Sequence, residues 1–257
     1  MSSELPKISI ITPSYNQGQF IEATIQSVLA QSYSNIEYII VDGGSTDSTM
    51  EVVDRYRDRL SLVIHEKDNG QSDAINKGFK AATGELVGWI NSDDILYTDC
   101  VQQIVKLYSA FGDGSVYYGS VNDWIDADGH IIGTRRLPIK SRNYLLNNNY
   151  DLIQQGSFYP TRLVREIGFL NEAIHYCMDL DLWLRLLEHG PIYAFSDYAL
   201  AGFRKWEETK TSTGGHKFMH DIRTTLLKYG ANPYSRAVLK TRYYGLKQRV
   251  KATLKAS

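Results

Sequence analysis

Short apolar runs typical of buried strands alternate with amphipathic helical patterns through the first 98 residues. The runs cover residues 7–13, 36–42, 60–65 and 86–90, and apolar residues recur at helical spacing between them. Strands that alternate with helices through short loops form right-handed crossovers and a largely parallel sheet. We therefore predict an α/β fold in which the loops after all four strands open at one edge of the sheet.

Two adjacent carboxylates follow the fourth run, in the sequence Asn91-Ser92-Asp93-Asp94. Ligands bind at the carboxyl ends of the strands in an open α/β sheet. Two acids at such an edge repel each other unless a cation or a donor-rich ligand compensates, and hard oxygen ligands suit Mg²⁺ or Mn²⁺ carrying a phosphate. The alternative is a solvated turn with a helix cap, and only the rest of the chain can decide between the two.

The pattern changes from residue 115 onward. Residues 115–125 and 130–135 are predicted strands on either side of Asp126-Ala127-Asp128-Gly129, a hairpin turn signal. Later patterns predict helices over residues 161–167, 178–189, 217–229 and 235–255, and strands over residues 192–195 and 198–203. We predict a first half of about residues 1–98, a mixed second half of about residues 115–205, and a helical basic extension over residues 206–257.

Composition indicates in which compartment the protein works and which partners are disfavoured. A net charge of −1 gives no bias toward nucleic acid, and 43% hydrophobic residues are ordinary for a globular domain. Cys100 and Cys177 lack CxxC spacing, which fits a reducing compartment. The first residues contain no apolar signal-peptide region, and no run approaches the roughly 18 apolar residues of a membrane-spanning helix. We expect a cytoplasmic protein.

The end of the chain is basic. Beyond Gly230 there is no Asp or Glu, whereas Lys and Arg occur seven times, at positions 236, 240, 242, 247, 249, 251 and 255. One interpretation is a peripheral contact with the inner face of a membrane, because basic residues bind anionic lipid. The other is a solvated helix that packs on the protein through Leu239, Tyr243 and Leu246.

Several segments together resemble the family 2 glycosyltransferases, which have the GT-A fold. The similarity runs from about residue 7 to residue 205. It rests on Ser9-Ile10-Ile11-Thr12-Pro13-Ser14-Tyr15-Asn16, Val41-Asp42-Gly43-Gly44-Ser45-Thr46-Asp47, Gly70-Gln71-Ser72-Asp73-Ala74-Ile75-Asn76-Lys77-Gly78, Asn91-Ser92-Asp93-Asp94 and Met178-Asp179-Leu180-Asp181-Leu182-Trp183-Leu184-Arg185. The resemblance implies a Rossmann-like, mostly parallel sheet with helices on both faces, a nucleotide-sugar half and an acceptor half within residues 1–205, and C-terminal helices.

The resemblance also implies roles for individual residues. Those expected to hold the nucleotide are Thr12, Pro13, Tyr15, Asp42, Asp73, Ser92 and Asp93, and those expected at the metal are Asp94, as a direct ligand, and Asp93. Simpler roles remain open for several of them. Thr12 and Pro13 could only end a strand, and Asp73 could cap the third helix. Asp42 is the stronger candidate, because the glycines beside it leave room for a ligand.

The acid that would act as catalytic base lies near residue 179. The family's usual pattern there is Glu-Asp, and in this chain Met178 replaces the Glu. On a helix, Asp179 shares a face with Leu182, Trp183 and Leu186, whereas Asp181 lines up with Arg185 as a surface pair. We therefore choose Asp179 as the base, with a plain helix cap as its alternative. The loss of the Glu leaves acceptor binding or activity itself in question.

The sequence gives fewer indications of which residues bind the acceptor. We expect Gln155 and Trp183 to shape the acceptor site, together with Gln154. Related chains often carry a histidine two residues after an arginine near the end of this half. Here Trp206 follows Arg204-Lys205, so either His216 or no histidine serves. Residues 207–215 are predicted as a loop that either closes over substrate or is simply disordered.

The sequence thus predicts an inverting, metal-dependent glycosyltransferase that uses Mn²⁺ or Mg²⁺. It would move a sugar from a nucleoside diphosphate to a hydroxyl of a glycan or lipid-linked glycan, in the synthesis of a cell-surface polysaccharide. The alternative is a non-catalytic module that binds a nucleotide-sugar or glycan, suggested by Met178. A nucleotidyltransferase is disfavoured, because Asn16-Gln17-Gly18-Gln19 is not a Gly- and Arg/Lys-rich triphosphate loop.

Overall fold

The computed structural model describes residues 5–206 and 215–256, with side chains to residue 248. A five-stranded sheet forms the centre of the molecule, in the order β3-β2-β1-β4-β9. The first four strands of that order are parallel, and β9 is antiparallel to β4. Its strands are β1 (Ile8–Ser14), β2 (Ile36–Asp42), β3 (Leu62–His65), β4 (Leu86–Trp89) and β9 (Tyr159–Pro160). The parallel sheet predicted from the alternating pattern is therefore confirmed.

Helices cover both faces of this sheet, as predicted. Successive residues of a strand point to opposite faces, so Ile39 and Val41 of β2 belong to one hydrophobic cluster and Tyr38 and Ile40 to another. One face carries α1 (Ile21–Leu29), α2 (Thr49–Asp54) and α4 (Cys100–Ala110), and the other carries α3 (Gln71–Ala81), α6 (Thr161–Glu166) and α7 (Met178–Leu186). Each of the two clusters contains residues from both predicted halves of the chain.

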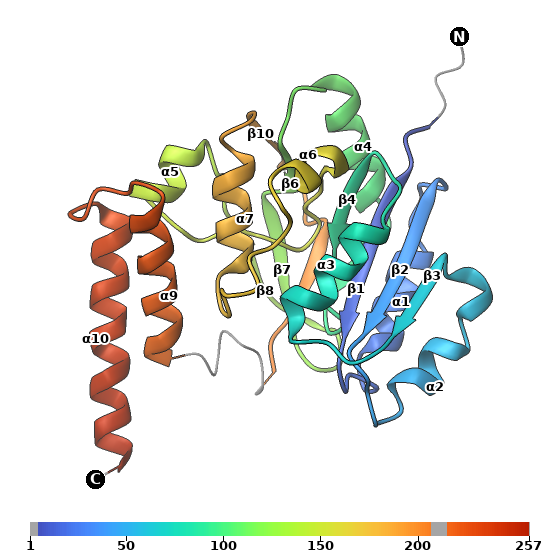
Figure 1. Ribbon diagram of the computed structural model, residues 1–257, viewed down its shortest axis with the longest axis horizontal. Helices are drawn as coiled ribbons and strands as arrows, with labels where there is room; N and C mark the ends of the chain where they lie inside the picture. Colours follow the sequence, from blue (N-terminus) through green and yellow to red (C-terminus); the bar gives the residue numbers. More distant parts are fainter. Residues whose placement is uncertain (1–4, 207–214, 257) are drawn as a thin grey trace.

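Close packing of α3 on the sheet requires a small residue. A Cβ added to Gly78 would lie 2.5 Å from Cγ2 of Ile11, so a larger side chain would push the helix away from β1. At the other end of α3, Nε2 of its first residue Gln71 donates to Oδ1 of Asn91, so the helix begins beside the carboxyl end of β4. The arrowheads of β2 and β3 show this edge at the lower side of Figure 1.

The second half is mixed, as expected. It contains a four-stranded sheet of order β5-β11-β7-β8 and a two-stranded parallel pair of β10 and β6. Residues 115–125 form two strands, because the chain changes sheets at Ser120, whose amide donates to the carbonyl of Phe195. The elements are β5 (Ile95–Leu96), β6 (Val116–Gly119), β7 (Val121–Ile125), β8 (Ile131–Arg136), α5 (Arg142–Asn147), β10 (Ile192–Phe195) and β11 (Ala201–Arg204). β7 and β8 form the predicted hairpin.

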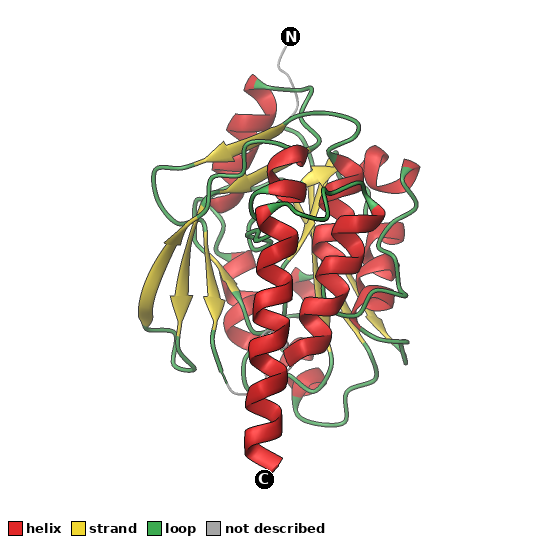
Figure 2. Ribbon diagram, turned by 90° about the vertical axis from the view of Figure 1, so that its left-hand side faces the viewer, coloured by secondary structure: helices red, strands yellow, loops and turns green. Residues whose placement is uncertain are grey.

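Two helices follow the second half and run side by side, α9 (Gly215–Lys228) and α10 (Arg236–Ala256). Figures 1 and 2 show α10 as a long helix at the outside of the molecule, with the C-terminus at its lower end. In the described part of the chain, no helix is both long and apolar enough to cross a membrane. Of the loop predicted over residues 207–215, residues 207–214 lie outside the described residues, and Gly215 begins α9.

Candidate active site

The residues singled out in the sequence gather at the carboxyl edge of the parallel sheet. Ser14 ends β1 directly beside Asp42 at the end of β2, and the amide of Gly43 donates to the carbonyl of Ser14. On the other side of β1, β4 leads into the turn that carries Asp93 and Asp94. The parallel topology therefore brings loops from three strands together, as predicted.

Asp94 is the inner member of the acidic pair. Its carboxylate is fully buried and accepts hydrogen bonds from the amide of Arg204 at 2.8 Å and from Nε2 of Gln155 at 2.9 Å. Nδ2 of Asn91 lies 3.2 Å from the same oxygen as Gln155. Three donors thus hold Asp94 inside the protein. The resemblance implies that Asp94 binds the metal directly. For its Oδ2 to do so, Gln155 or Asn91 must give up its hydrogen bond to that oxygen.

Asp93 is the more accessible acid, and its side chain is half-buried. Its Oδ2 accepts a hydrogen bond from Nε1 of Trp206 at 2.9 Å, and its carbonyl accepts one from Nε of Arg204 at 2.8 Å. Phe20 packs against both of these residues, edge-on to Trp206 and under the guanidinium of Arg204. A hard cation at this turn would therefore meet Asp93 first.

Burial raises the pKa of both carboxyls. The pKa of Asp94 lies well above its ordinary value because of burial and the negative charge of Asp93. The pKa of Asp93 is raised by burial, against the opposing effects of the Trp206 hydrogen bond and the Arg204 charge. The two ionised carboxylates would repel each other in this buried site. A divalent cation would relieve that repulsion, and the carboxylate oxygens are suitable ligands for it.

Asp42 organises the loop after β2. Its Oδ2 accepts hydrogen bonds from the amides of Gly44 and Ser45, at 3.0 and 2.8 Å, and lies 2.8 Å from Nδ1 of His65. The hydroxyl of Ser45 donates to Oδ1. The carboxylate is fully buried, so in this conformation no exposed oxygen faces a nucleobase. His65 was not predicted as a site residue, although it ends β3 at the same edge of the sheet as Asp42.

The end of β1 differs in part from expectation. Thr12 is fully buried and its hydroxyl lies 3.0 Å from that of Tyr38, so its side chain points into the core. Neither Thr12 nor Pro13 ends the strand, because β1 continues to Ser14. Pro13 is also buried. Tyr15 is 60% exposed and can therefore stack on a base. The hydroxyl of Ser14 is buried beside Asp42, and no protein group within the described chain pairs with it.

Asp73 and Ser92 lie at the same edge. Oδ2 of Asp73 accepts hydrogen bonds from the amide and from Nδ2 of Asn69, at 2.9 and 3.2 Å, so Asp73 braces the loop before α3. This is the helix-start role that was left open for it. Ser92 is buried in the turn that precedes Asp93.

The start of α7 adjoins the start of α3. The hydroxyl of Ser72 donates to the sulfur of Met178 at 2.8 Å, and Nε2 of the neighbouring Gln71 donates to Oδ1 of Asn91 at 2.8 Å. These contacts connect the first turn of α7 to the turn of the acidic pair. Asp179 lies in that first turn and is half-buried. Burial raises the pKa of Tyr159, and the negative charge of nearby Asp179 adds to the effect.

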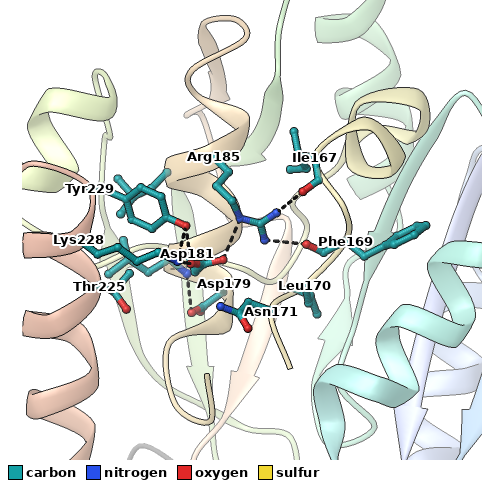
Figure 3. A network of polar contacts seen from close by, with 12 residues as sticks. Ile167, Phe169, Leu170, Asn171, Asp179, Asp181, Arg185, Thr225, Lys228 and Tyr229 are labelled. Atoms are coloured by element: carbon teal, nitrogen blue, oxygen red, sulfur yellow. Dashed lines mark hydrogen bonds and ion pairs between the residues drawn. The ribbon is translucent and has the colours of Figure 1, made fainter. Parts of the chain in front are cut away.

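Asp181 is buried, which corrects the expectation of a surface pair. Its predicted partner Arg185 is present, at 2.9 Å between Nε and Oδ2, but Asp181 is fully enclosed. Oδ1 accepts from the hydroxyl of Tyr229 at 2.7 Å and lies 3.5 Å from Nζ of Lys228 (Figure 3). Arg185 also donates to the carbonyls of Ile167 and Phe169. Asp181 therefore joins α7 to α9.

Trp183 was expected at the acceptor site, and the structure corrects this as well. Trp183 is fully buried in the core, and Nε1 donates to the hydroxyl of Tyr159 at 2.9 Å. An acceptor at the surface cannot contact this indole. Gln155 lies on Asp94 instead of in an open acceptor pocket, and Gln154 donates to the carbonyl of Trp89.

Two residues near the acidic pair were missed as site residues, Arg204 and Trp206. In the sequence, Trp206 stands out only because it replaces a histidine. Its contact with Asp93 bridges 113 positions and cannot be inferred from local spacing. His216, the alternative histidine, is exposed in the first turn of α9.

Two further features lie outside the acidic pair. A groove of about 490 Å³ lies beside Asp181, Arg185 and Lys228, away from the acidic pair. In the β7–β8 turn, ligand atoms of Asp126, Asp128 and His130 lie within 4.8 Å of one another, close enough to hold a metal ion. Nη1 of Arg204 donates to the carbonyls of Asp126 and Ala127, so this turn is attached to the Asp93 turn.

Comparison with known proteins identifies the family. The family model described as "Glycosyl transferase family 2" matches residues 9–168, which is more than half of the chain. The chain belongs to glycosyl transferase family 2. The matched segment contains the ends of β1, β2 and β4 and both members of the acidic pair, whereas Asp179 and Trp206 lie beyond it.

Relatives within this family include longer proteins. An uncharacterized glycosyltransferase of Rickettsia felis is 34% identical over 248 residues, which cover 89% of this chain and 41% of the relative. One of Rickettsia conorii is 28% identical over 88% of this chain and 40% of its own length. The chain therefore spans about two fifths of the length of these two relatives.

Solved structures share the GT-A fold. TarS of S. aureus, in complex with UDP-GlcNAc, superposes with a TM-score of 0.71 at 20% identity, over 88% of this chain and 67% of that one. The mannosyltransferase PcManGT of Pyrobaculum calidifontis, in complex with GDP-Man and Mn²⁺, superposes with a TM-score of 0.64 at 18% identity, over 99% and 76%. At these identities the likeness establishes the fold.

Proposed function

We propose that this protein transfers a sugar from a nucleoside diphosphate to a hydroxyl acceptor, with inversion at the anomeric carbon. The observation that carries the proposal is the approach of two acidic groups from different halves. The turn of Asp93 and Asp94 and the first turn of α7, which holds Asp179, are connected through Asn91, Gln71, Ser72 and Met178. A donor held by the first group would present its anomeric carbon near the second.

The donor would lie along the carboxyl edge of the sheet. Tyr15 is exposed for stacking on the base, and Asp93 would hold the ribose or the cation that accompanies the diphosphate. Asp42 and Asp73 would act by fixing the two loops that surround the base, since both carboxylates already accept hydrogen bonds from those loops. Asp94 would anchor the turn of Asp93 from inside.

A divalent cation, Mn²⁺ or Mg²⁺, fits the acidic pair, because the pair offers carboxylate oxygens as ligands and its two negative charges repel each other. When bound, it would neutralise negative charge on the leaving diphosphate. Asp93 is the ligand with accessible oxygen, and Asp94 becomes one if Gln155 or Asn91 moves aside. A Mn²⁺ ion in the complex of PcManGT supports this choice of metal.

Asp179 would take the proton of the acceptor hydroxyl. Its position in the first turn of α7 keeps the carboxylate near the positive end of the helix, which favours the ionised form that a base needs. One base and one in-line attack imply inversion. The acceptor would be a glycan or lipid-linked glycan at the inner face of the membrane, in surface polysaccharide synthesis, with residues 1–205 as the catalytic domain and residues 206–257 as its basic extension.

The first test is calorimetric titration with UDP, GDP, dTDP and CDP, each with Mn²⁺ and again with EDTA. Neighbours bound to UDP-GlcNAc and to GDP-Man support a nucleotide-sugar donor but differ in the base. We expect one of the four to bind in a metal-dependent way, and Asp93→Ala to abolish that binding. If none binds, the donor site is refuted.

A second candidate is a non-catalytic module that binds a nucleotide-sugar or glycan. Met178 favours it, since its buried thioether replaces a carboxylate of the family's usual pattern. Such a module would bind the nucleotide but show no release of UDP or GDP from any donor with any acceptor. Turnover that is lost in Asp179→Asn, with nucleotide binding intact, would establish the enzyme.

A further inference from the structure

One face of α10 packs on the protein. Ala237, Val238 and Thr241 are fully buried there. At the edge of this face, Nζ of Lys240 donates to Oδ2 of Asp151 at 3.0 Å and to Oδ1 of Asn149 at 3.1 Å. These contacts fix the rotation of the helix about its own axis. They therefore determine which residues point away from the protein.

The residues that point away include three large apolar side chains. Of the two interpretations of the basic end, the one in which Leu239, Tyr243 and Leu246 pack on the protein is contradicted by the structure. Their exposed fractions are 45%, 63% and 65%. The three follow each other at steps of four and three, so they form one stripe along the solvent side of the helix. A stripe of large apolar side chains in water indicates a binding surface.

Basic residues border this stripe on both sides. Helical spacing places Arg236 and Lys247 along one side of it and Arg242 along the other, and all three are exposed. The sequence contains no Asp or Glu after Gly230. An apolar centre with basic borders and without acids is the pattern of a helix that lies in the interface of an anionic membrane.

We propose that the outward face of α10, defined by Leu239, Tyr243 and Leu246 with Arg236, Arg242 and Lys247, binds an anionic phospholipid surface. The leucines would enter the boundary between headgroups and acyl chains, and the tyrosine ring would lie at headgroup depth. The basic side chains are long enough to keep their charges at the lipid phosphates. Charge argues against a second copy of this face as the partner, because its basic borders would repel each other.

The position of α10 relates this surface to the proposed active site. The helix runs along the outside of the molecule, and its C-terminal end points to the same side as the carboxyl ends of β2 and β3 (Figures 1 and 2). A membrane bound along α10 would therefore lie parallel to the direction in which the donor edge opens and would hold the proposed active site close to the membrane surface. This consequence rests on the proposed function, whereas lipid binding by α10 does not.

The test is co-sedimentation of the full chain with vesicles of phosphatidylglycerol and phosphatidylcholine, and with vesicles of phosphatidylcholine alone. We expect binding to the first and little to the second, and weaker binding at high salt. The triple variant Leu239→Gln, Tyr243→Gln, Leu246→Gln should bind at least about tenfold more weakly. The variant Arg236→Gln, Arg242→Gln, Lys247→Gln should lose the preference for anionic lipid. Glutamine is chosen because it is a good helix former.

Matched controls use exposed residues on other elements. Ile131 and Ile132 of β8 are 61% and 55% exposed, so Ile131→Thr, Ile132→Thr removes apolar surface without touching α10. Lys106→Gln, Lys140→Gln, Arg162→Gln removes three exposed charges elsewhere. Both controls should bind vesicles like the wild type. Helicity by circular dichroism confirms that each variant is folded.

Three results would overturn the proposal. The wild type could bind neither vesicle, it could bind both equally, or the α10 variants could bind like the controls. A dimer in sedimentation velocity that dissociates in the apolar variant, without lipid binding, would assign the surface to a second copy. Nucleotide titration of the same variants separates the two proposals, since lipid binding can fail while nucleotide binding persists, and the reverse.

Discussion

The indole of Trp206 donates a hydrogen bond to the carboxylate of Asp93 at 2.9 Å, so a neutral donor lies on the more accessible acid of the pair. This hydrogen bond lowers the pKa of Asp93 against the effect of burial. The same ring packs edge-on against Phe20, with 5.1 Å between centroids. Trp206 thus favours the ionised form of Asp93 and holds its carboxylate in place.

Trp206→Phe removes the donor and keeps an aromatic ring against Phe20. The pKa of Asp93 should rise, because the hydrogen bond stabilises the ionised form. Loss of a hydrogen bond to a charged group costs about 1.5 to 3 kcal/mol, so Mn²⁺-dependent nucleotide binding should weaken by about tenfold or more near neutral pH. Calorimetric titration measures this. An unchanged dissociation constant would show that Trp206 does not support Asp93.

Asp179→Asn tests the catalytic base. The substitution keeps the side-chain oxygen that accepts from the amide of Leu180 at 2.8 Å, so the start of α7 should remain intact. Loss of a general base lowers turnover by about 10² to 10⁴-fold. We expect this decrease in donor turnover, measured as release of nucleoside diphosphate, with unchanged nucleotide affinity. Turnover equal to that of the wild type would remove Asp179 from this role.

Asp181→Ala is the matched contrast on the same helix. Asp181 is buried between Arg185, Tyr229 and Lys228, and its removal leaves the Arg185 guanidinium without its carboxylate. Breaking a buried pair in this way costs about 3 to 5 kcal/mol, which corresponds to a melting temperature lower by several degrees. Thermal unfolding measures the effect. A melting temperature within about one degree of the wild type would contradict the structural role of Asp181.

The sequence predicted the sheet because its signals are local. Each apolar run and each amphipathic pattern identifies an element, and the handedness of crossovers then fixes parallel strands and a common edge. The positions of Asp42, Asp93 and Asp94 follow from that edge. For this reason the fold and the gathering of these acids could be stated before any coordinates.

Whether a side chain is buried depends on segments that are far away in the sequence, so burial was predicted poorly. Helical spacing gives the face on which Asp181 lies, but that face is covered by Tyr229, directly after α9, and by the loop at Phe169. In the same way, Trp183 lies under Tyr159 and does not reach the surface. For the stripe of α10 the sequence left two interpretations open, since amphipathic spacing indicates an apolar face without indicating whether protein or another partner covers it.

The pH dependence of metal binding provides the last prediction. Burial and the charge of Asp93 raise the pKa of Asp94 well above 3.8, and burial raises that of Asp93. A folded pKa above the unfolded value means that the apo protein loses stability as the pH rises from about 4 through the raised pKa. A cation competes with these protons, so its affinity should fall as the pH decreases through the same window. The stabilisation by Mn²⁺ should therefore be largest at the upper end of that window.

Thermal unfolding with Mn²⁺ or EDTA, between about pH 5 and about pH 8, measures this stabilisation. Mn²⁺ at about 100 times its dissociation constant should add about 2.7 kcal/mol, and Asp93→Asn should abolish the increase. Asp128→Asn is the control, because Asp126, Asp128 and His130 form the other group within the described residues that could hold a metal. If Asp128→Asn removes the stabilisation and Asp93→Asn retains it, the metal site belongs to the β7–β8 turn. If both variants retain it, neither group binds the stabilising ion.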